Sequence, residues 1–528
     1  MKPTFLLFTL AATVTLAACD VDPQDGNSAD NREGMNGLAV DGRIAGGKVW
    51  VDANNNNAID DFEPYAFTDS DGYYSYNPLT ITNYCALPVI SDEYQRFCLI
   101  YGSSVDSMVI RIKGGTDLST GERLKGVMAM SSTISSSSQR SSTPLVLSPI
   151  TTLLQGANSN SDRTSIRSAL GVTSDLDLRL DFSTASDEKS RRFLANSIAV
   201  QTMMDVLTSS TEVTDTSATQ VSIINQISTQ VAQNNVRPTS LPSTNIAQIA
   251  RTVSANTATQ NSIASRLSQL NAEIQRIETA VNTSAVNAQL KASEVVSQLI
   301  KKEVRNTDRD AVSRVLDSGI ANLSTSLVSN LSNTTVEFDI ASITNSLVDA
   351  GKNAVTTLTP SEMNEAAEDA ASEATLATGT QWGGSWFVLE ATAEDSDDLA
   401  AGSYIALRLD GNADSTSGRI DTCVNVSAAN PEDDDEVFEN EYVGGRWSKL
   451  SDGVIQLSFD YEGQEFEGQM KAKAKIDGEA QKFRFTSDVD GTSESGDLRL
   501  NVNGQAALSS VARPQSAEDC ANQVDSVL

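Results

Sequence analysis

The chain has 528 residues with 38 basic and 70 acidic side chains, a formal charge of −32, and no histidine. A negative field of this size repels nucleic acid and anionic lipid, which argues against nucleic-acid binding. The lack of histidine removes Ser-His-Asp and Cys-His catalysis and the usual zinc ligand sets, so we predict that the protein is not an enzyme.

The first 18 residues have the features of a secretory signal. Met1-Lys2-Pro3 carries one positive charge, and the uncharged run that follows is shorter than the about 20 apolar residues of a spanning helix. Leu16-Ala17-Ala18-Cys19 then resembles the lipobox of diacylated bacterial lipoproteins. The resemblance implies cleavage before Cys19 and attachment of diacylglycerol and a further acyl chain such as palmitate, which together anchor the mature chain to a membrane.

The residues after this cysteine bear on location. Asp20 resembles the signal that keeps lipoproteins of enteric bacteria in the inner membrane, whereas other Gram-negative groups sort differently. We expect a lipid-anchored cell-envelope protein, with the outer membrane or cell surface favoured and the inner membrane left open. Residues 19–37 are rich in Asp, Asn, Gly and Ser and cannot form a core, which predicts a flexible tether.

A calcium-type loop begins at Asp52. Oxygen-bearing side chains occupy positions 1, 3, 5, 9 and 12 of the segment that ends at Glu63, and apolar Ile59 is at position 8. Position 6 is usually Gly because the backbone there is left-handed, and Asn57 is the next most tolerant residue. The predicted calcium ligands are Asp52, Asn54, Asn56, the carbonyl of Ala58, Asp60 and Glu63.

The flanks of this loop indicate strands. Val49–Val51 precedes it, Thr68–Tyr76 has the pattern of a strand, an Asp-Gly turn and a strand, and Met108–Ile112 is the last expected strand. The combination resembles the B-type repeats of Gram-positive surface adhesins and the related carboxypeptidase-regulatory-like modules. The resemblance implies a small β-sandwich over residues 38–115 that bound Ca²⁺ stiffens, and an Asn-rich surface turn is the alternative.

Four cysteines remain besides the lipidated one. An even number in an oxidising compartment predicts two disulfides, for which three connectivities are possible. Proximity favours the pairs Cys85–Cys98 and Cys423–Cys520. The first would close a short loop, worth about 3 kcal/mol on the chain-entropy model.

The middle of the chain is predicted to be helical. Residues 116–150 are expected to form a linker, at whose end Ser148 caps a helix that starts with Pro149. Residues 151–376 have few aromatic residues and are expected to form a helical spacer. An unbroken helix over residues 244–303 would span about 90 Å.

A seam of apolar residues runs along this expected helix. It fits either an intramolecular bundle, which its many Ala and Ser positions favour, or an intermolecular coiled coil. Its first members are Ile263, Leu267, Leu270, Ile274, Ile277 and Val281.

Three further motifs carry weaker signals. Ser186–Lys189 matches a Ser-x-x-Lys pattern, but companion motifs are absent and a helix start is preferred. Asp410–Asp414 lacks the hydrophobic anchor of a calcium loop and is expected to be a hairpin turn. The acidic run Glu432–Glu436 is expected to be a solvated loop.

Residues 377–513 are rich in aromatic and β-branched residues and are followed by a tail, 514–528. Eight segments predict an antiparallel meander, closed as a barrel or packed as a sandwich. Gly384-Ser385-Trp386 resembles the Gly-x-Trp signature of lipocalins, which carry small apolar ligands. The expected strands are Ser385–Thr392, Tyr404–Leu409, Ile420–Val426, Gly445–Leu450, Val454–Tyr461, Phe466–Ile476, Gln481–Thr486 and Asp497–Val502.

The expected fold class is therefore multidomain α+β, with a small β-sandwich, a helical bundle or coiled coil, and an antiparallel β barrel or sandwich. We expect a non-enzymatic envelope lipoprotein that displays a binding or adhesion domain for an envelope protein or polysaccharide. A lipocalin-like carrier of apolar ligands is the second hypothesis. A polysaccharide-acting enzyme with paired carboxylates is the third, which the sequence leaves open without suggesting it.

Overall fold

A computed structural model gives the fold of the chain. It is a mixed α+β structure, and none of the helices in the described part of the chain is long and apolar enough to cross a bilayer. The structure describes residues 34–60, 62–85, 95–100, 108–118, 124, 126–132, 144–209, 216–305, 309–317, 319–333, 343–347, 380, 382–390, 404–412, 414–426, 438–451, 453–461, 464–472, 482–489 and 492–500.

The N-terminal β module contains two main sheets that face a common apolar core. One has the strand order β11-β1-β5 and the other β10-β8-β3-β4. Two short pairs, β2 with β9 and β6 with β7, complete the module. The strands are β1 Gly37–Ala39, β2 Ile44–Ala45, β3 Lys48–Asp52, β4 Tyr65–Phe67, β5 Tyr73–Tyr74, β6 Tyr76–Asn77, β7 Thr82–Asn83, β8 Met108–Lys113, β9 Thr116–Asp117, β10 Val127–Ser132 and β11 Leu145–Leu147.

The expected linker differs from the structure. Residues 116–150 include β9, β10 and β11, of which β10 pairs antiparallel with β8 and β11 pairs parallel with β1. These strands bury Met128, Met130 and Leu147 in the core of the module. The sheets therefore continue to Leu147, because these apolar residues complete the module and could not remain on an exposed linker.

The central region is a helical bundle over the β module. Ser148 caps α3 and Pro149 is its first residue, as the sequence predicts. The helices are α3 Pro149–Gln155, α4 Asn160–Leu170, α5 Glu188–Thr208, α6 Thr216–Asn234, α7 Ser243–Ala250, α8 Thr257–Ile274, α9 Thr283–Val304, α10 Arg309–Asp317 and α11 Ile320–Asn333, with 3₁₀ turns η1 Asp175–Arg179, η2 Pro238–Ser240 and η3 Gln275–Thr279.

Residues 244–303 do not form one unbroken helix, so the span of about 90 Å does not apply. The chain breaks between α7 and α8, and again between α8 and α9 at η3, and Asn256 and Asn282 cap the new helices with their side chains. Most of the seam, from Ile263 to Ile277, is buried in the chain's own helical core, whereas Val281 lies in the second break and is 89% exposed. The chain's own helices therefore cover the seam from Ile263 to Ile277.

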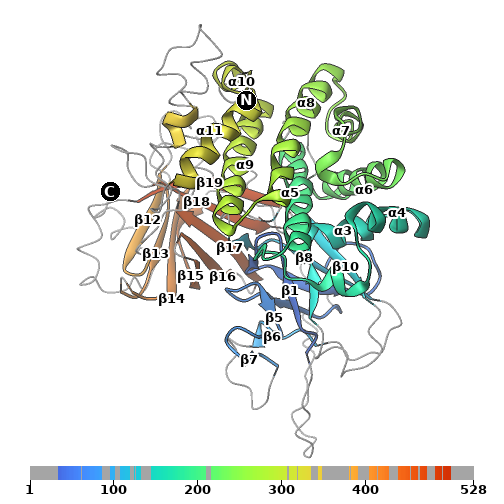
Figure 1. Ribbon diagram of the computed structural model, residues 1–528. Coiled ribbons are helices and arrows are strands. Elements are labelled where there is room, and N and C mark those ends of the chain that lie inside the picture. Colours follow the sequence, from blue (N-terminus) through green and yellow to red (C-terminus); the bar gives the residue numbers. More distant parts are fainter. Residues whose placement is uncertain are drawn as a thin grey trace, which may run out of the picture.

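This helical core continues into the β module. Leu38, Val40, Tyr73 and Val146 from the module belong to the same cluster of buried residues as the helices. Figure 1 shows the helices gathered on one side of the two β regions, with the C-terminal β region beside the module.

The C-terminal region is a closed barrel of eight antiparallel strands in sequence order. Of the two arrangements that the sequence left open, the structure has the barrel, because the last strand pairs with the first at Phe387 and Leu500. Trp382, Phe387 and Trp447 are buried in its core. The strands are β12 Ser385–Glu390, β13 Tyr404–Leu409, β14 Ser417–Val426, β15 Phe438–Ser451, β16 Val454–Tyr461, β17 Gln464–Ala472, β18 Lys482–Val489 and β19 Thr492–Leu500.

The barrel packs against the β module through one face of β16 and β17. Gln469 donates to Gln456 across these strands at 2.9 Å, and its amide oxygen accepts from the hydroxyl of Thr116 in β9. Gly46 lies opposite, and a Cβ there would clash with the amide oxygen of Gln456. The barrel therefore contacts the module directly, because a polar patch on its outer wall is matched by Thr116 and a glycine.

Candidate functional site

The predicted calcium loop connects β3 to β4 at one end of the module. Its first carboxylate, Asp52, is 2% exposed and accepts the backbone N–H of Asn56 at 3.0 Å and of Asn57 at 3.1 Å. The guanidinium of Arg111 on β8 forms a buried ion pair with the same carboxylate and donates to Asn55 at 2.7 Å. Sequence reasoning missed Arg111, because only the pairing of β3 with β8 brings it to the loop.

The last carboxylate of the loop closes it on the other side. Glu63 is 4% exposed, and its two oxygens accept the backbone N–H of Ala53 at 2.7 Å and of Asp60 at 3.2 Å. The loop is therefore tied at both ends by buried carboxylates that accept backbone donors. Such hydrogen bonds to an ionised acceptor are stronger than neutral ones.

The remaining predicted ligands face one another across the loop. The side-chain amides of Asn54 and Asn56 donate to one oxygen of Asp60, at 2.7 and 2.9 Å. The carbonyl of Ala58 accepts from the indole N–H of Trp50 at 3.1 Å. Asn57 has φ of 66°, the left-handed conformation that its position requires.

The donor set of this loop fits calcium in kind. All six predicted ligands offer oxygen, which is the ligand atom that Ca²⁺ prefers, and they lie on one short loop. In the part of the chain that the structure describes, no three carboxylate or cysteine side chains gather closely enough to hold a metal ion. Calcium would therefore depend on the carbonyl oxygens of Asn54, Asn56 and Ala58, and it would share Asp52 with Arg111.

A second carboxylate centre follows at the turn between β4 and β5. Asp69 is 4% exposed and accepts the backbone N–H of Asp71 and of Tyr73, each at 2.8 Å. Its other oxygen accepts from Asn77 at 2.7 Å and from the phenol of Tyr84 at 2.6 Å. Burial raises the pKa of Asp69, and these donors oppose that rise.

The sequence predicted the Asp-Gly turn that contains Asp69, but not the four hydrogen bonds that Asp69 accepts. The turn carries the chain from the sheet of β4 to the sheet of β5, so the two strands that flank it do not pair with each other. Asn77 and Tyr84 reach the carboxylate from the β6–β7 hairpin and the residues after it.

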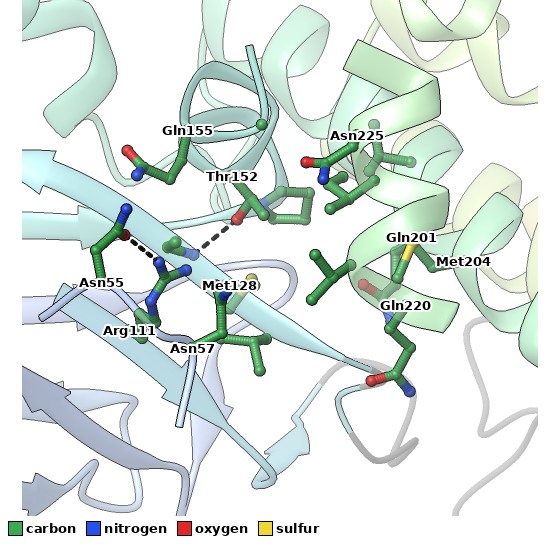
Figure 2. Close-up of a pocket in the computed structure, with 17 residues that line it drawn as sticks. Asn55, Asn57, Arg111, Met128, Thr152, Gln155, Gln201, Met204, Gln220 and Asn225 are labelled. Carbon is green, nitrogen blue, oxygen red and sulfur yellow. Dashed lines mark hydrogen bonds between the residues drawn. The ribbon is translucent and has the colours of Figure 1, made fainter. Parts of the chain in front are cut away.

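A pocket lies beside the calcium-type loop, between the β10-β8-β3-β4 sheet and helices α3, α5 and α6. Figure 2 shows Asn55, Asn57 and Arg111 on its sheet side, facing Gln201 and Asn225 on the helices. Its volume is about 170 Å³. Sequence reasoning did not anticipate this pocket, because its walls come from separate segments between Asn55 and Asn225.

One predicted disulfide is present among the described residues. Cys85 and Cys98 are bonded, with their Cα atoms 5.1 Å apart. Cys423 is buried on β14 and is also disulfide-bonded, but its predicted partner Cys520 lies outside the described residues. The lipidation residue Cys19 lies outside them too.

The weaker motifs have structural roles where they are described. Asp187 of the Ser-x-x-Lys segment caps α5, and Lys189 pairs with Asp177 at 2.8 Å. Asp410–Asp414 lies in the connection between β13 and β14, which form a hairpin, as expected. The acidic run Glu432–Glu436 lies outside the described residues.

No protein-family model matches this chain, and no curated protein or solved structure is significantly similar to it.

Proposed function

We propose that the chain is a lipid-anchored, non-enzymatic binding protein of the bacterial cell envelope, whose N-terminal β module is stiffened by calcium. The lipobox-like residues before Cys19 and the polar tether after it support the anchor. The helices and the barrel both pack on the β module, so stiffening that module would hold the whole molecule in one shape.

The observation that carries the calcium part is the closure of the Asp52–Glu63 loop. Buried carboxylates tie both of its ends to backbone donors, and within the described residues Asp60 accepts side-chain hydrogen bonds from two neutral amides. A divalent cation would replace those amide donors and bind the carbonyl oxygens that the same side chains carry. The negative charge of the whole protein would also raise the local cation concentration.

The calcium part is tested on the full mature chain with Cys19→Ser, which is free of lipid. We expect millimolar calcium to raise the melting temperature, because a ligand at a hundred times its Kd stabilises the folded state by about 2.7 kcal/mol. Asp60→Asn should abolish the shift, whereas Asp175→Asn, an exposed aspartate on η1, should keep it. Equal melting temperatures in calcium and in chelator would contradict calcium binding.

The anchor is tested separately in cells. The wild-type chain should pellet with envelopes and enter the detergent phase, and Cys19→Ser should leave it soluble in the exported fraction. If Cys19→Ser still pellets as before, the lipid anchor is wrong, whatever the calcium experiment shows.

The closed barrel favours a second candidate, a carrier of small apolar molecules. Eight strands give an interior that either side chains fill or one small ligand occupies. The neutral fluorescent probe N-phenyl-1-naphthylamine should then bind the full chain, and Leu457→Trp, which enlarges a buried core side chain of β16, should displace it. A probe that binds neither protein would rule out this candidate.

A further inference from the structure

The pocket beside the calcium-type loop is built from two layers of the molecule. Its sheet side contains Arg111 of β8 and Met128 of β10, and its helix side contains residues of α3, α5 and α6 (Figure 2). The volume of about 170 Å³ corresponds to roughly six water molecules at ~30 Å³ each. That space suits one ring-sized molecule.

The described lining mixes polar and apolar side chains and carries almost no net charge. Among the described residues that line the pocket, Arg111 is the one with a charged side chain, and its guanidinium is already paired with Asp52 and Asn55. An anionic ligand would meet a compensated cation inside a strongly negative protein, and a cationic ligand would find no carboxylate among the described lining residues. The pocket therefore selects an uncharged molecule.

Several carboxamides line this pocket, and three of them have hydrogen-bonding groups that no described residue uses. Within the part of the chain that the structure describes, the side chains of Asn57, Gln220 and Asn225 form no hydrogen bond to protein. Gln201 and Gln155 also line the pocket but are engaged, the first as a donor to Asp205 at 2.9 Å and the second as an acceptor from Ser131. The apolar part of the lining is Val127, Met128, Val200, Met204, Val221 and Ile224.

The edge of the sheet is closed to an added peptide strand. β10 is the edge strand, and its central outward N–H, on Ala129, donates to the hydroxyl of Thr152 at 2.9 Å. That hydroxyl in turn donates to the carbonyl of Ser148 at 2.7 Å, so α3 covers this edge. Strand addition would need this N–H to be free, which argues against an extended peptide as the ligand.

We propose that this pocket binds a single neutral sugar unit, which rests on the proposed function as a binding protein and names its ligand class. Hydroxyl groups both donate and accept, as carboxamides do, so Asn57, Gln220 and Asn225 can each pair with a sugar without a charge. The ring's C–H groups would lie against Met128, Met204 and Val221. The partly open pocket admits either a free sugar or the end of a saccharide chain.

The test is saturation-transfer NMR on the full mature chain with Cys19→Ser. The probes are glucose, galactose and N-acetylglucosamine, with glucosamine and glucuronate as charged counterparts. We expect at least one neutral sugar to bind with millimolar Kd and its charged counterpart to bind at least tenfold more weakly. The double variant Gln220→Ala/Asn225→Ala should weaken binding roughly tenfold for each hydrogen bond lost.

A matched control is Gln226→Ala, which removes a carboxamide from the same helix outside the pocket and should leave binding unchanged. The proposal would be overturned if none of the neutral sugars bound, or if the double variant bound them as tightly as the parent chain. It would also be overturned if the pocket preferred N-acetylalanine methylamide, a small model of a peptide, to the sugars. Its failure is separate from that of the proposed function, because the calcium shift in melting temperature and the Cys19→Ser fractionation do not depend on sugar.

Discussion

Two buried aspartates of the β module are compensated in opposite ways. Asp52, in the calcium-type loop, accepts two backbone N–H groups and is paired with Arg111. Asp41, in the turn between β1 and β2 at the junction with the helices, is 6% exposed, and its Oδ1 has no hydrogen-bond partner among the described residues. Asp52 therefore has a cationic partner in Arg111, whereas Asp41 has an oxygen that accepts no hydrogen bond from the described residues.

The surroundings of Asp41 enlarge this difference. Burial raises its pKa well above the ordinary value, and the charges of Asp117 on β9, Asp205 on α5 and Glu294 on α9 raise it further. The surroundings of Asp41 therefore favour its protonated form by raising its pKa, whereas a guanidinium compensates Asp52. Buried charge is stable in proteins only when something neutralises it, and the choice of neutraliser decides whether a region responds to pH or to competing cations.

The largest expected effect comes from removing Arg111, the cationic partner of Asp52. Arg111→Met should lower the free energy of unfolding by about 3–5 kcal/mol, because it leaves a buried carboxylate without its partner. Urea unfolding in chelator measures this loss. Calcium should restore part of it and should bind the variant more tightly than the wild type, because the cation no longer shares Asp52 with Arg111.

Arg167→Met is the control for that experiment. Arg167 pairs with Asp175, which is 82% exposed, so its loss should cost about 1 kcal/mol or less. If Arg111→Met and Arg167→Met had equal stability, the ion pair at Asp52 would not be what holds the loop.

The second effect concerns the disulfide that supports the Asp69 centre. Tyr84, a donor to Asp69, is adjacent to Cys85, so the bond to Cys98 restrains a hydrogen-bond partner of a third buried aspartate. Replacing both cysteines by Ser should lower the free energy of unfolding by about 3 kcal/mol, as expected for a loop of this length. Reducing agent should destabilise the wild type to a similar extent in this module, and an unchanged urea midpoint for the double variant would contradict the prediction.

Local patterns allowed much of the fold to be predicted from sequence. The eight expected strands of the C-terminal region overlap β12–β19 in order, because aromatic and β-branched runs separated by turns are a local signal. The start of α3 and the left-handed Asn57 were predicted for the same reason, since Ser148-Pro149 and the loop spacing act within a few residues.

Long-range partners could not be predicted. Arg111 is 59 residues from Asp52, and only the register of β3 with β8 brings the two together. The strands of residues 116–150 were assigned to a linker because β11 completes its sheet by pairing with β1, far back in the sequence. The helix breaks near Asn256 and Asn282 were also missed, because the seam spacing looked continuous while tertiary packing set the actual ends.

The third effect is a dependence on pH at Asp41. A carboxyl group whose pKa is raised in the folded state stabilises the fold fully below its ordinary pKa, and that contribution is lost as pH rises through the folded value. The wild type should therefore lose stability, relative to Asp41→Asn, as pH rises from 4. Urea midpoints of the two proteins across this range measure the difference, and a constant difference at every pH would show that Asp41 does not titrate as the structure indicates.

The smallest effect is expected at Asp69. Its environment is intermediate between those of Asp52 and Asp41, because its described hydrogen-bond partners are all neutral donors. Burial raises the pKa of Asp69, so its contribution to the free energy of unfolding declines with rising pH, as that of Asp41 does. Four hydrogen bonds stabilise the ionised form of Asp69 and therefore limit this decline. Asp69→Asn should change the free energy of unfolding at neutral pH by only about 1 kcal/mol, since it relieves a desolvated charge and weakens charge-assisted hydrogen bonds at once. Asp71→Asn, at a less buried carboxylate of the same turn, is the matched control for the change in the free energy of unfolding. A pH dependence at Asp69 as steep as that at Asp41 would mean that neutral donors do not substitute for a cation. The difference between Asp52 and Asp41 would then depend only on the ion pair of Asp52 with Arg111.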